Sequence, residues 1–251
     1  MKDYLATVVK NERIAENIYE ITFQTDEEVS VRPGQFGDIL VGGTHLLRRP
    51  IAICKVDGNT VTYCYQVKGE GTQKLKTVQA GEKLNVLMPL GNGFFVEENE
   101  KKVALVGGGV GVFPLISVLR AYANTKEISA YIGYRNKDAV CGVDEFVKAN
   151  KFVAVTDDGS YGEKMNSVQA FMKDVKEGNR PDVVLACGPL PMLRALKTFV
   201  EEENLPCYVS LEERMGCGIG ACLVCVCTLT SGARARVCKD GPVFNAKAVT
   251  L

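Results

Sequence analysis

The sequence is poor in the residue that proton-transfer catalysis uses most, because His45 is the only histidine among 251 residues. No grouping of histidine and carboxylates has the pattern of a substrate acid–base site, so we expect no catalytic side chain of that kind. Net charge is also lacking, because thirty Lys and Arg residues balance thirty Asp and Glu residues. This balance gives no indication of a nucleic acid or a membrane surface as a partner.

Long apolar runs are missing as well. The longest uncharged run, residues 103–119, is interrupted by four glycines and by Pro114, which is typical of a buried strand, a glycine turn and a buried helix. Residues 1–8 include an acidic side chain and no continuous apolar core, so they do not have the pattern of a secretory signal. We therefore expect a cytoplasmic protein whose ten cysteines stay reduced.

Four of those cysteines stand close together near the end of the chain. Cys217, Cys222 and Cys225 have the spacing C-x4-C-x2-C, and Cys238 follows after twelve residues. This is the plant-type ferredoxin order of ligands to a [2Fe–2S] cluster, whereas a zinc ribbon has two C-x2-C pairs. Glycines at positions 216, 218 and 220 allow the backbone to approach a cluster closely. A zinc site and buried structural thiols remain the alternatives.

Other cysteines are isolated in apolar stretches and are interpreted as small core side chains. Cys227 belongs with them, because it alternates with Cys225 as a strand residue would. The isolated cysteines of this kind are Cys54, Cys64, Cys141 and Cys207.

The pattern of apolar residues divides the chain into three regions. Residues 1–99 hold closely spaced strand patterns with glycine turns, which predicts a small antiparallel β-barrel. Residues 100–205 alternate short apolar strands with helical patterns, which predicts a parallel α/β domain. Residues 206–251 hold the clustered cysteines. The expected strands are 7–9, 18–23, 36–41, 51–54, 60–65, 103–106, 128–134, 152–156 and 183–187, and the expected helices are 72–78, 110–122, 143–149, 166–175 and 191–203.

A glycine-rich turn follows the first strand of the expected α/β domain. Counted from Gly109, it has the form G-x-G-x-x-P, through Gly111 to Pro114, and Gly107 precedes it. Backbone N–H groups at a strand–turn–helix junction bind pyrophosphate, and proline suits the first helical turn. A purely structural turn is the alternative interpretation.

A second phosphate-binding pattern lies in the barrel region. Arg48 and Arg49 enter a strand, and the sequence Gly69-Glu70-Gly71-Thr72 follows about twenty residues later at an expected helix start. Together they have the composition of a pyrophosphate clamp, although paired loop arginines are also often simply solvated.

These residues resemble the ferredoxin–NADP reductase superfamily, in which a barrel binds FAD and an α/β domain binds a pyridine nucleotide. The flavin motif of that superfamily, R-x-Y-S, falls on Arg49, Pro50, Ile51 and Ala52. Only the arginine is kept. Ile51 stands where a tyrosine would face the flavin, and Ala52 stands where a serine hydroxyl would lie near flavin N5.

The C-terminal region narrows the resemblance. Residues 211–222 and 237–244, with the segments 48–51, 71–72, 156–162 and 187–189, are similar to the electron-transfer subunit of NAD-dependent (class 1B) dihydroorotate dehydrogenase. The similarity runs along essentially the whole chain. It implies a partner subunit that carries FMN and oxidises dihydroorotate in pyrimidine (UMP) biosynthesis, in a heterotetramer of two subunits of each kind. It also implies electron transfer from that FMN through a [2Fe–2S] cluster and FAD to NAD+.

The resemblance also assigns residues to cofactors. The iron ligands are Cys217, Cys222, Cys225 and Cys238. The residues that bind FAD are Arg49, Pro50, Ile51, Ala52, Gln66, Val67, Lys68, Gly71 and Thr72. The expected NAD site consists of Gly107, Gly109, Gly111, Pro114, Asp157, Cys187 and Gly188.

The choice of nicotinamide nucleotide rests on carboxylates. No acid stands some twenty residues after the glycine turn, where Tyr134 and Arg135 end a strand, but Asp157 and Asp158 end the next one. Carboxylates there disfavour a 2′-phosphate, and the resemblance favours NAD. Cys187 ends the fourth strand, where a ligand crevice is expected, and a buried core thiol is the alternative.

Two other functions remain open at this stage. Small subunits of NADH-dependent ferredoxin–NADP oxidoreductases and of sulfide dehydrogenases have the same modules and the same cysteine spacing. A zinc-stabilised or redox-sensing binding module without turnover is the alternative of another class. Three charged residues stand before the cysteines, namely Glu212, Glu213 and Arg214. The alternatives are that they help to fix the cluster loop, that they dock a partner, or that they form a solvated run of charges.

Overall fold

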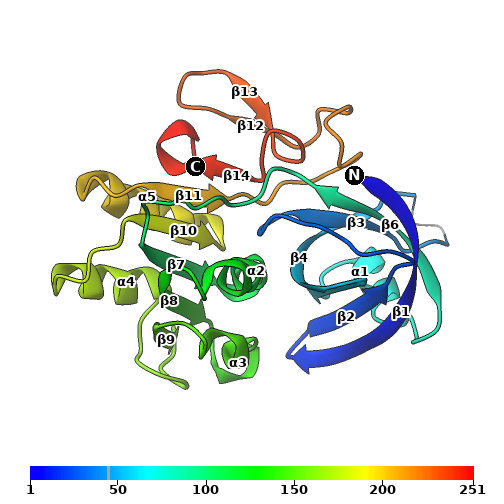
Figure 1. Ribbon diagram of the computed structural model, residues 1–251, viewed down its shortest axis with the longest axis horizontal. Helices are drawn as coiled ribbons and strands as arrows, with labels where there is room; N and C mark the ends of the chain where they lie inside the picture. Colours follow the sequence, from blue (N-terminus) through cyan, green and yellow to red (C-terminus); the bar gives the residue numbers. More distant parts are fainter. Residues whose placement is uncertain (44–45) are drawn as a thin grey trace.

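A computed structural model describes residues 1–43 and 46–251, and His45, the only histidine, lies outside the described residues. Figure 1 shows a β-barrel beside a layered α/β domain, with the C-terminal segment lying along the top of both. Helix α2 (Val112–Tyr122) lies between the barrel and the central strands, where its apolar side chains are buried.

The N-terminal region forms the predicted antiparallel barrel. Its six strands close in the order β1-β2-β5-β4-β3-β6. Asp57 pairs with Thr60 across a two-residue turn in which Gly58 has a φ of +60°, and this turn joins β4 and β5 in a hairpin. The strands are β1 (Lys2–Ala15), β2 (Ile18–Gln24), β3 (Phe36–Leu40), β4 (Arg49–Asp57), β5 (Thr60–Gln66) and β6 (Lys83–Leu90).

The barrel contains one helix, α1 (Glu70–Leu75), which begins and ends earlier than the expected range 72–78. It begins early because Gly69 is its N-cap and the Thr72 hydroxyl closes the first turn by accepting a hydrogen bond from the N–H of Gly69 at 3.2 Å. It ends early because Val78 turns into the barrel core and its N–H donates to the carbonyl of Leu75.

The second region forms a six-stranded sheet in the order β14-β11-β10-β7-β8-β9. The pairs from β11 to β9 are parallel, as predicted, but β14 at the edge is antiparallel to β11. The strands are β7 (Lys102–Gly108), β8 (Glu127–Tyr134), β9 (Lys151–Thr156), β10 (Val183–Cys187), β11 (Cys207–Ser210) and β14 (Val243–Asn245). The other helices and short turns are η1 (Gly109–Gly111), η2 (Lys137–Ala139), α3 (Val143–Phe146), α4 (Ser167–Lys176), α5 (Leu190–Glu202) and η3 (Ala246–Ala248).

The C-terminal segment is tied closely to the rest of the molecule. It contributes both β11 and β14 to the α/β sheet, and it also forms a small hairpin of β12 (Val226–Thr228) and β13 (Arg234–Arg236). The boundaries 1–99, 100–205 and 206–251 therefore remain a prediction about sequence units, because the third unit shares a sheet with the second.

Ion pairs connect the barrel with the α/β domain. Glu145 of α3 lies 3.5 Å from Lys55 of β4 and 3.6 Å from Arg120 of α2, and Arg120 lies 2.6 Å from Asp57 of the barrel. Together with the apolar packing of α2 on β4, this network holds the two domains in one arrangement. Among the described residues, no helix combines the length and the apolar character that crossing a membrane requires.

Candidate functional site

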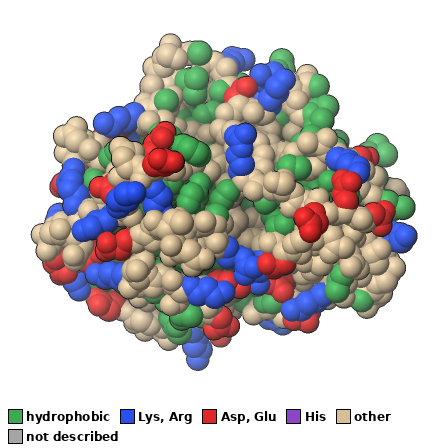
Figure 2. Space-filling view, in the orientation of Figure 1, with side chains coloured by type: hydrophobic (Ala, Val, Ile, Leu, Met, Phe, Trp, Pro, Cys, Tyr) green, Lys and Arg blue, Asp and Glu red, His purple; other side chains and the backbone are tan. Residues whose placement is uncertain are grey.

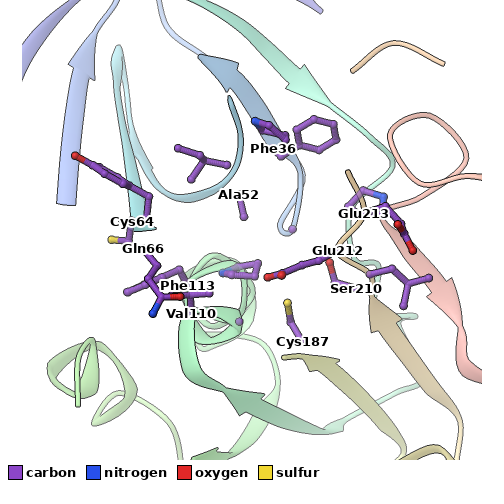
Figure 3. Close-up of a pocket in the computed structure, with 18 of the residues that line it drawn as sticks. Phe36, Ala52, Cys64, Gln66, Val110, Phe113, Cys187, Ser210, Glu212 and Glu213 are labelled. Carbon is purple, nitrogen blue, oxygen red and sulfur yellow. The ribbon is translucent and has the colours of Figure 1, made fainter. Parts of the chain in front are cut away.

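A cavity of about 280 Å³ lies where all three parts of the chain meet. Ala52 and Gln66 of the barrel line one side, and Val110 and Cys187 of the α/β domain line the other. Figure 3 shows these side chains facing one another, with the Glu212 side chain extending between Ala52 and Cys187. On the face drawn in Figure 2, hydrophobic side chains are scattered among the charged ones, and some of them lie together near the middle.

Most of the residues predicted to bind FAD meet at this cavity. Val67 does not line it, because its side chain packs against the barrel core and its N–H donates to the carbonyl of Asn17 at 2.9 Å. The predicted residues that line the cavity are Pro50, Ile51, Ala52, Gln66, Lys68 and Thr72.

Two residues of the predicted clamp, Arg49 and Gly71, lie together beside the cavity. A Cβ added to Gly71 would stand 1.8 Å from Arg49 Nε, so the guanidinium lies directly against the backbone of α1. Arg49 donates only to the carbonyls of Leu47 and Arg48 among the described residues, which leaves the positive charge without a carboxylate partner. This is a cradle for an anionic group, so the residues present fit a flavin dinucleotide.

Unlike Arg49, Arg48 has hydrogen-bond partners in several strands of the barrel. Its Nη1 donates to the carbonyls of Asp38 at 3.2 Å and Asn85 at 3.3 Å, and its Nη2 lies 3.4 Å from the Asp3 carboxylate. Arg48 therefore braces three strands of the barrel.

A larger cavity of about 680 Å³ lies at the carboxyl ends of the parallel strands, next to the glycine turn. Gly109, Gly111, Asp157 and Gly188 line it, as the sequence predicts. The other three predicted residues lie nearby. Pro114 and Cys187 line the first cavity, and Gly107 is buried in β7, where an added Cβ would stand 2.9 Å from Leu115 Cδ1.

The two cavities share part of their walls. Gln66, Lys68, Val110, Gly111 and Glu212 line both. Ligands held in the two cavities would therefore meet at this common wall. The sequence leaves open whether Glu212 fixes a loop, docks a partner or is solvated, and the tertiary structure places it between the two cavities.

Several residues of the larger cavity were not predicted from the sequence. Asn166 caps α4 and accepts a hydrogen bond from the N–H of Gln169, so a capping signal before an expected helix was the only sequence clue. Its other unpredicted lining residues include Arg135, Asn136, Ser167 and Met192.

Cys187 is buried at the end of β10, so its thiol is held neutral. Burial raises the pKa of Cys187 to about 12, the charge of Glu212 adds to the rise, and a hydrogen bond with Ser210 opposes it. The thiol thus lines the first cavity as a small neutral group.

Backbone N–H groups of the cysteine loop point at the sulfur of Cys217. The N–H groups of Ala221 and Cys222 point at Cys217 Sγ, at 3.3 and 3.4 Å. Burial opposes ionisation of this thiol, but the N–H groups of Ile219, Cys222 and Ala221 prevail and lower its pKa to about 6. Backbone N–H donors of this kind suit thiolate ligands.

Cys225 and Cys238 form a second, buried pair. The N–H of Cys238 donates to Cys225 Sγ at 3.4 Å. Burial raises the pKa of Cys238 to about 12, and its hydrogen bond with the Cys225 thiol adds to the rise. No three His, Cys, Asp or Glu side chains in the part of the chain that the structure describes are already grouped for a metal ion. The predicted donor set is four thiols, with N–H groups aimed at the sulfurs of Cys217 and Cys225, and such soft ligands fit a cluster better than a harder metal ion.

The loop needs its glycines, and Cys227 lies apart from it. Gly218 and Gly220 have φ values of +69° and +84°, a region that favours glycine. An added Cβ on Gly220 would stand 2.6 Å from Lys239 Cδ. Cys227 is a buried residue of β12 opposite Ala235, which agrees with its interpretation as a core side chain.

Comparisons with known proteins agree with this geometry. Residues 105–198 match the oxidoreductase NAD-binding domain, and residues 212–250 match the iron-sulfur cluster binding domain of dihydroorotate dehydrogenase B. A solved structure of an NADH-dependent reduced ferredoxin–NADP oxidoreductase is 29% identical, with a TM-score of 0.87 over 98% of this chain and 90% of that one. Fold and site thus define a flavin- and nicotinamide-dependent oxidoreductase of the ferredoxin reductase type, with an added iron–sulfur segment.

Two bacterial relatives identify the family. The electron transfer subunits of dihydroorotate dehydrogenase B (NAD+) from Bacillus cereus (strain Q1) and Bacillus mycoides (strain KBAB4) are each 43% identical to this chain over 97% of both lengths. The chain belongs to the family of dihydroorotate dehydrogenase B (NAD+) electron transfer subunits, as its sequence predicted. It is an oxidoreductase subunit, and its predicted cofactors, FAD, NAD and an iron–sulfur cluster, are confirmed at the level of the domains.

Proposed function

We propose that this chain carries electrons between the FMN of a dihydroorotate dehydrogenase catalytic subunit and NAD+, in pyrimidine (UMP) biosynthesis. One observation carries the proposal: the flavin cavity is lined by Ala52 of the barrel, Val110 of the α/β domain and Met215 of the cluster segment. When bound there, FAD exchanges electron pairs with a nicotinamide and single electrons with an iron–sulfur cluster. The protein supplies the cavity in which FAD, the nicotinamide and the cluster come close to one another.

The proposed residue roles follow the positions described above. Arg49, Gly71 and Thr72 hold the FAD pyrophosphate, and the remaining predicted FAD residues surround the flavin. Gly109, Gly111 and Gly188 leave room for NAD, and the Asp157 carboxylate disfavours a 2′-phosphate in the same cavity. Cys217, Cys222, Cys225 and Cys238 hold the [2Fe–2S] cluster.

We also propose the docking face for the catalytic subunit. Cys222 is exposed, and apolar side chains stand exposed beside it: Ile219 is 43% exposed, Leu223 62% and Val224 56%. Contiguous exposed apolar side chains mark interaction surfaces. Docking here would exclude water from the cluster and shorten the electron path. A heterotetramer of two subunits of each kind in the cytoplasm is expected from the family resemblance and from the reduced cysteines.

A serine scan of the cysteines tests the proposal. A soft thiolate ligand is poorly replaced by an oxygen, so Cys217→Ser, Cys222→Ser, Cys225→Ser and Cys238→Ser should each bleach the visible absorption and the reduced-state EPR signal of the cluster. Cys227→Ser is the matched control and should keep both signals, because its thiol lies in β12.

Two assays then show which electron-transfer step a ligand variant has lost. NADH reduction of a dye that accepts electrons directly from FAD should survive in every ligand variant that folds. Dihydroorotate-driven NAD+ reduction, measured with the FMN subunit, should collapse. The proposal is wrong if a cluster-free complex with intact FAD and FMN still reduces NAD+ with dihydroorotate at the normal rate. Native mass spectrometry of the complex checks the stoichiometry.

A further inference from the structure

Asp38 is a buried carboxylate that the proposed function does not use. It lies on β3, only 1% exposed, and its Oδ1 atom is buried with no hydrogen-bond partner among the described residues. Burying an unpaired polar group costs free energy, so such a group calls for an explanation.

The side chain of Asp38 points at the cysteine loop. A Cβ added to Gly218 would stand 2.6 Å from Asp38 Oδ2 and 3.3 Å from Leu90 Cδ1, so the carboxylate contacts the residue that follows Cys217. The loop therefore rests on the outer face of the barrel at this point, with glycine required both by the contact and by the positive φ.

On the side of strand β4, Asp38 is next to the proposed flavin site. Its partner in the adjacent strand is Pro50, which lines the flavin cavity. On one side, Asp38 thus pairs with Pro50 of the cavity wall. On the other side, it contacts Gly218, which directly follows the predicted iron ligand Cys217.

The Asp38 carboxylate is negatively charged in this buried position. Burial raises the pKa of Asp38 to about 6, and the positive charges of Arg48 and Arg49 oppose that rise. At pH 8 the group is therefore ionised. A negative charge in a poorly solvated position acts more strongly on its surroundings than a charge in water.

We propose that Asp38 is a positioning residue that seats the Gly218 turn on the barrel and places a negative charge between the flavin and the cluster, keeping the reduction potential of the cluster low. The inference rests on the proposed ligand role of Cys217 and its partners. A negative charge opposes the addition of an electron nearby, and a fixed seat holds the cluster at one distance from the flavin.

The first experiment removes the charge and keeps the shape. Asp38→Asn, purified with its FMN subunit, should retain FAD and iron per protein but show a cluster reduction potential shifted upward at pH 8 in an EPR-monitored titration. Asp26→Asn is the control, because Asp26 is an exposed carboxylate in the loop after β2, where solvent and salt screen it. Its cluster potential should equal that of the unaltered protein.

The second experiment disturbs the seat and leaves Asp38 unchanged. Gly218→Ala and Gly232→Ala both place an alanine at a positive φ, +69° and +82° respectively, but nothing lies within 4 Å of a Cβ on Gly232. Gly218→Ala should lower the iron content several-fold and broaden the EPR signal while FAD content stays normal. Gly232→Ala should retain iron and an unchanged signal.

The outcomes separate this inference from the proposed function. An unaltered protein that assembles no [2Fe–2S] cluster would contradict the proposed function itself. A normal cluster in the unaltered protein, with no shift of potential in Asp38→Asn, overturns the charge role of Asp38. Equal iron content and EPR signals in the two alanine variants overturn its seating role, and this second comparison decides the matter if Asp38→Asn does not fold.

Discussion

The guanidinium of Arg49 lies against the backbone of Gly71, so closely that a methyl group on Gly71 would stand 1.8 Å from Arg49 Nε. Arg49 has no carboxylate partner among the described residues, whereas Arg48 is held by two backbone carbonyls and by Asp3. Two adjacent arginines therefore serve different purposes. One is available to a ligand, and the other braces the barrel.

We expect Arg49→Ala to weaken FAD binding much more than Arg48→Ala. Loss of a charge-assisted contact costs about 1.5–3 kcal/mol, which corresponds to a roughly 10- to 150-fold higher Kd. The flavin content of the two purified variants, and titration of the apoproteins with FAD, measure the difference. Equal flavin content would show that Arg49 is not the pyrophosphate residue.

A matched pair of glycine variants tests the same clamp from the other side. In Gly71→Ala the new methyl group must displace the Arg49 side chain, so we expect FAD to be lost on gel filtration. Gly69→Ala is the control, because a Cβ there meets nothing within 4 Å and the backbone is extended, with φ at −132°. Retention of FAD in Gly71→Ala would mean that the Arg49 contact is dispensable.

Ala52 leads to a prediction about hydride transfer. It lines the flavin cavity where the related superfamily motif has a serine, so flavin N5 must obtain its hydrogen bond from another group. Ala52→Ser should therefore leave FAD binding nearly unchanged and alter the stopped-flow rate of flavin reduction by NADH only modestly. A rise of a hundredfold or more would show instead that this chain has lost that interaction without replacing it.

Asp174 gives a prediction about stability and pH. Its carboxylate is buried under the sheet, where it accepts hydrogen bonds from Tyr131, Lys151 and Asn179. Burial alone would raise the pKa of Asp174, but these partners prevail and lower it below its ordinary value. The stabilisation is therefore fully present above the ordinary aspartate pKa and is lost as the pH falls through the lowered pKa.

We expect Asp174→Asn to lower the free energy of unfolding near pH 7 by about 1–3 kcal/mol, because it removes a charge from a hydrogen-bonded group. Urea denaturation at pH 7 and at decreasing pH measures this, and the difference from the unaltered protein should shrink below about pH 4. Asp144→Asn, an exposed position on α3, should leave stability unchanged. A difference that stays constant down to pH 3 would exclude the charged form as its source.

Local patterns determined much of this protein. The C-x4-C-x2-C spacing predicted the cluster segment, and the change from closely spaced strands to alternating strands and helices predicted the barrel and the α/β domain. These features are legible in sequence because ligand spacing and hydrophobic periodicity act over a few residues.

Only the tertiary structure decided which distant residues meet. Glu212 stands in a charged run that is typical of a solvated loop, yet it lines both cavities, because β11 delivers it to the junction of the domains. Val67 follows a strand that leads to the flavin site, yet its side chain turns into the barrel core. Asp38 contacts Gly218 because the cysteine loop packs on strand β3. The two residues are 180 positions apart in the sequence, and no local sequence pattern carries information over that separation.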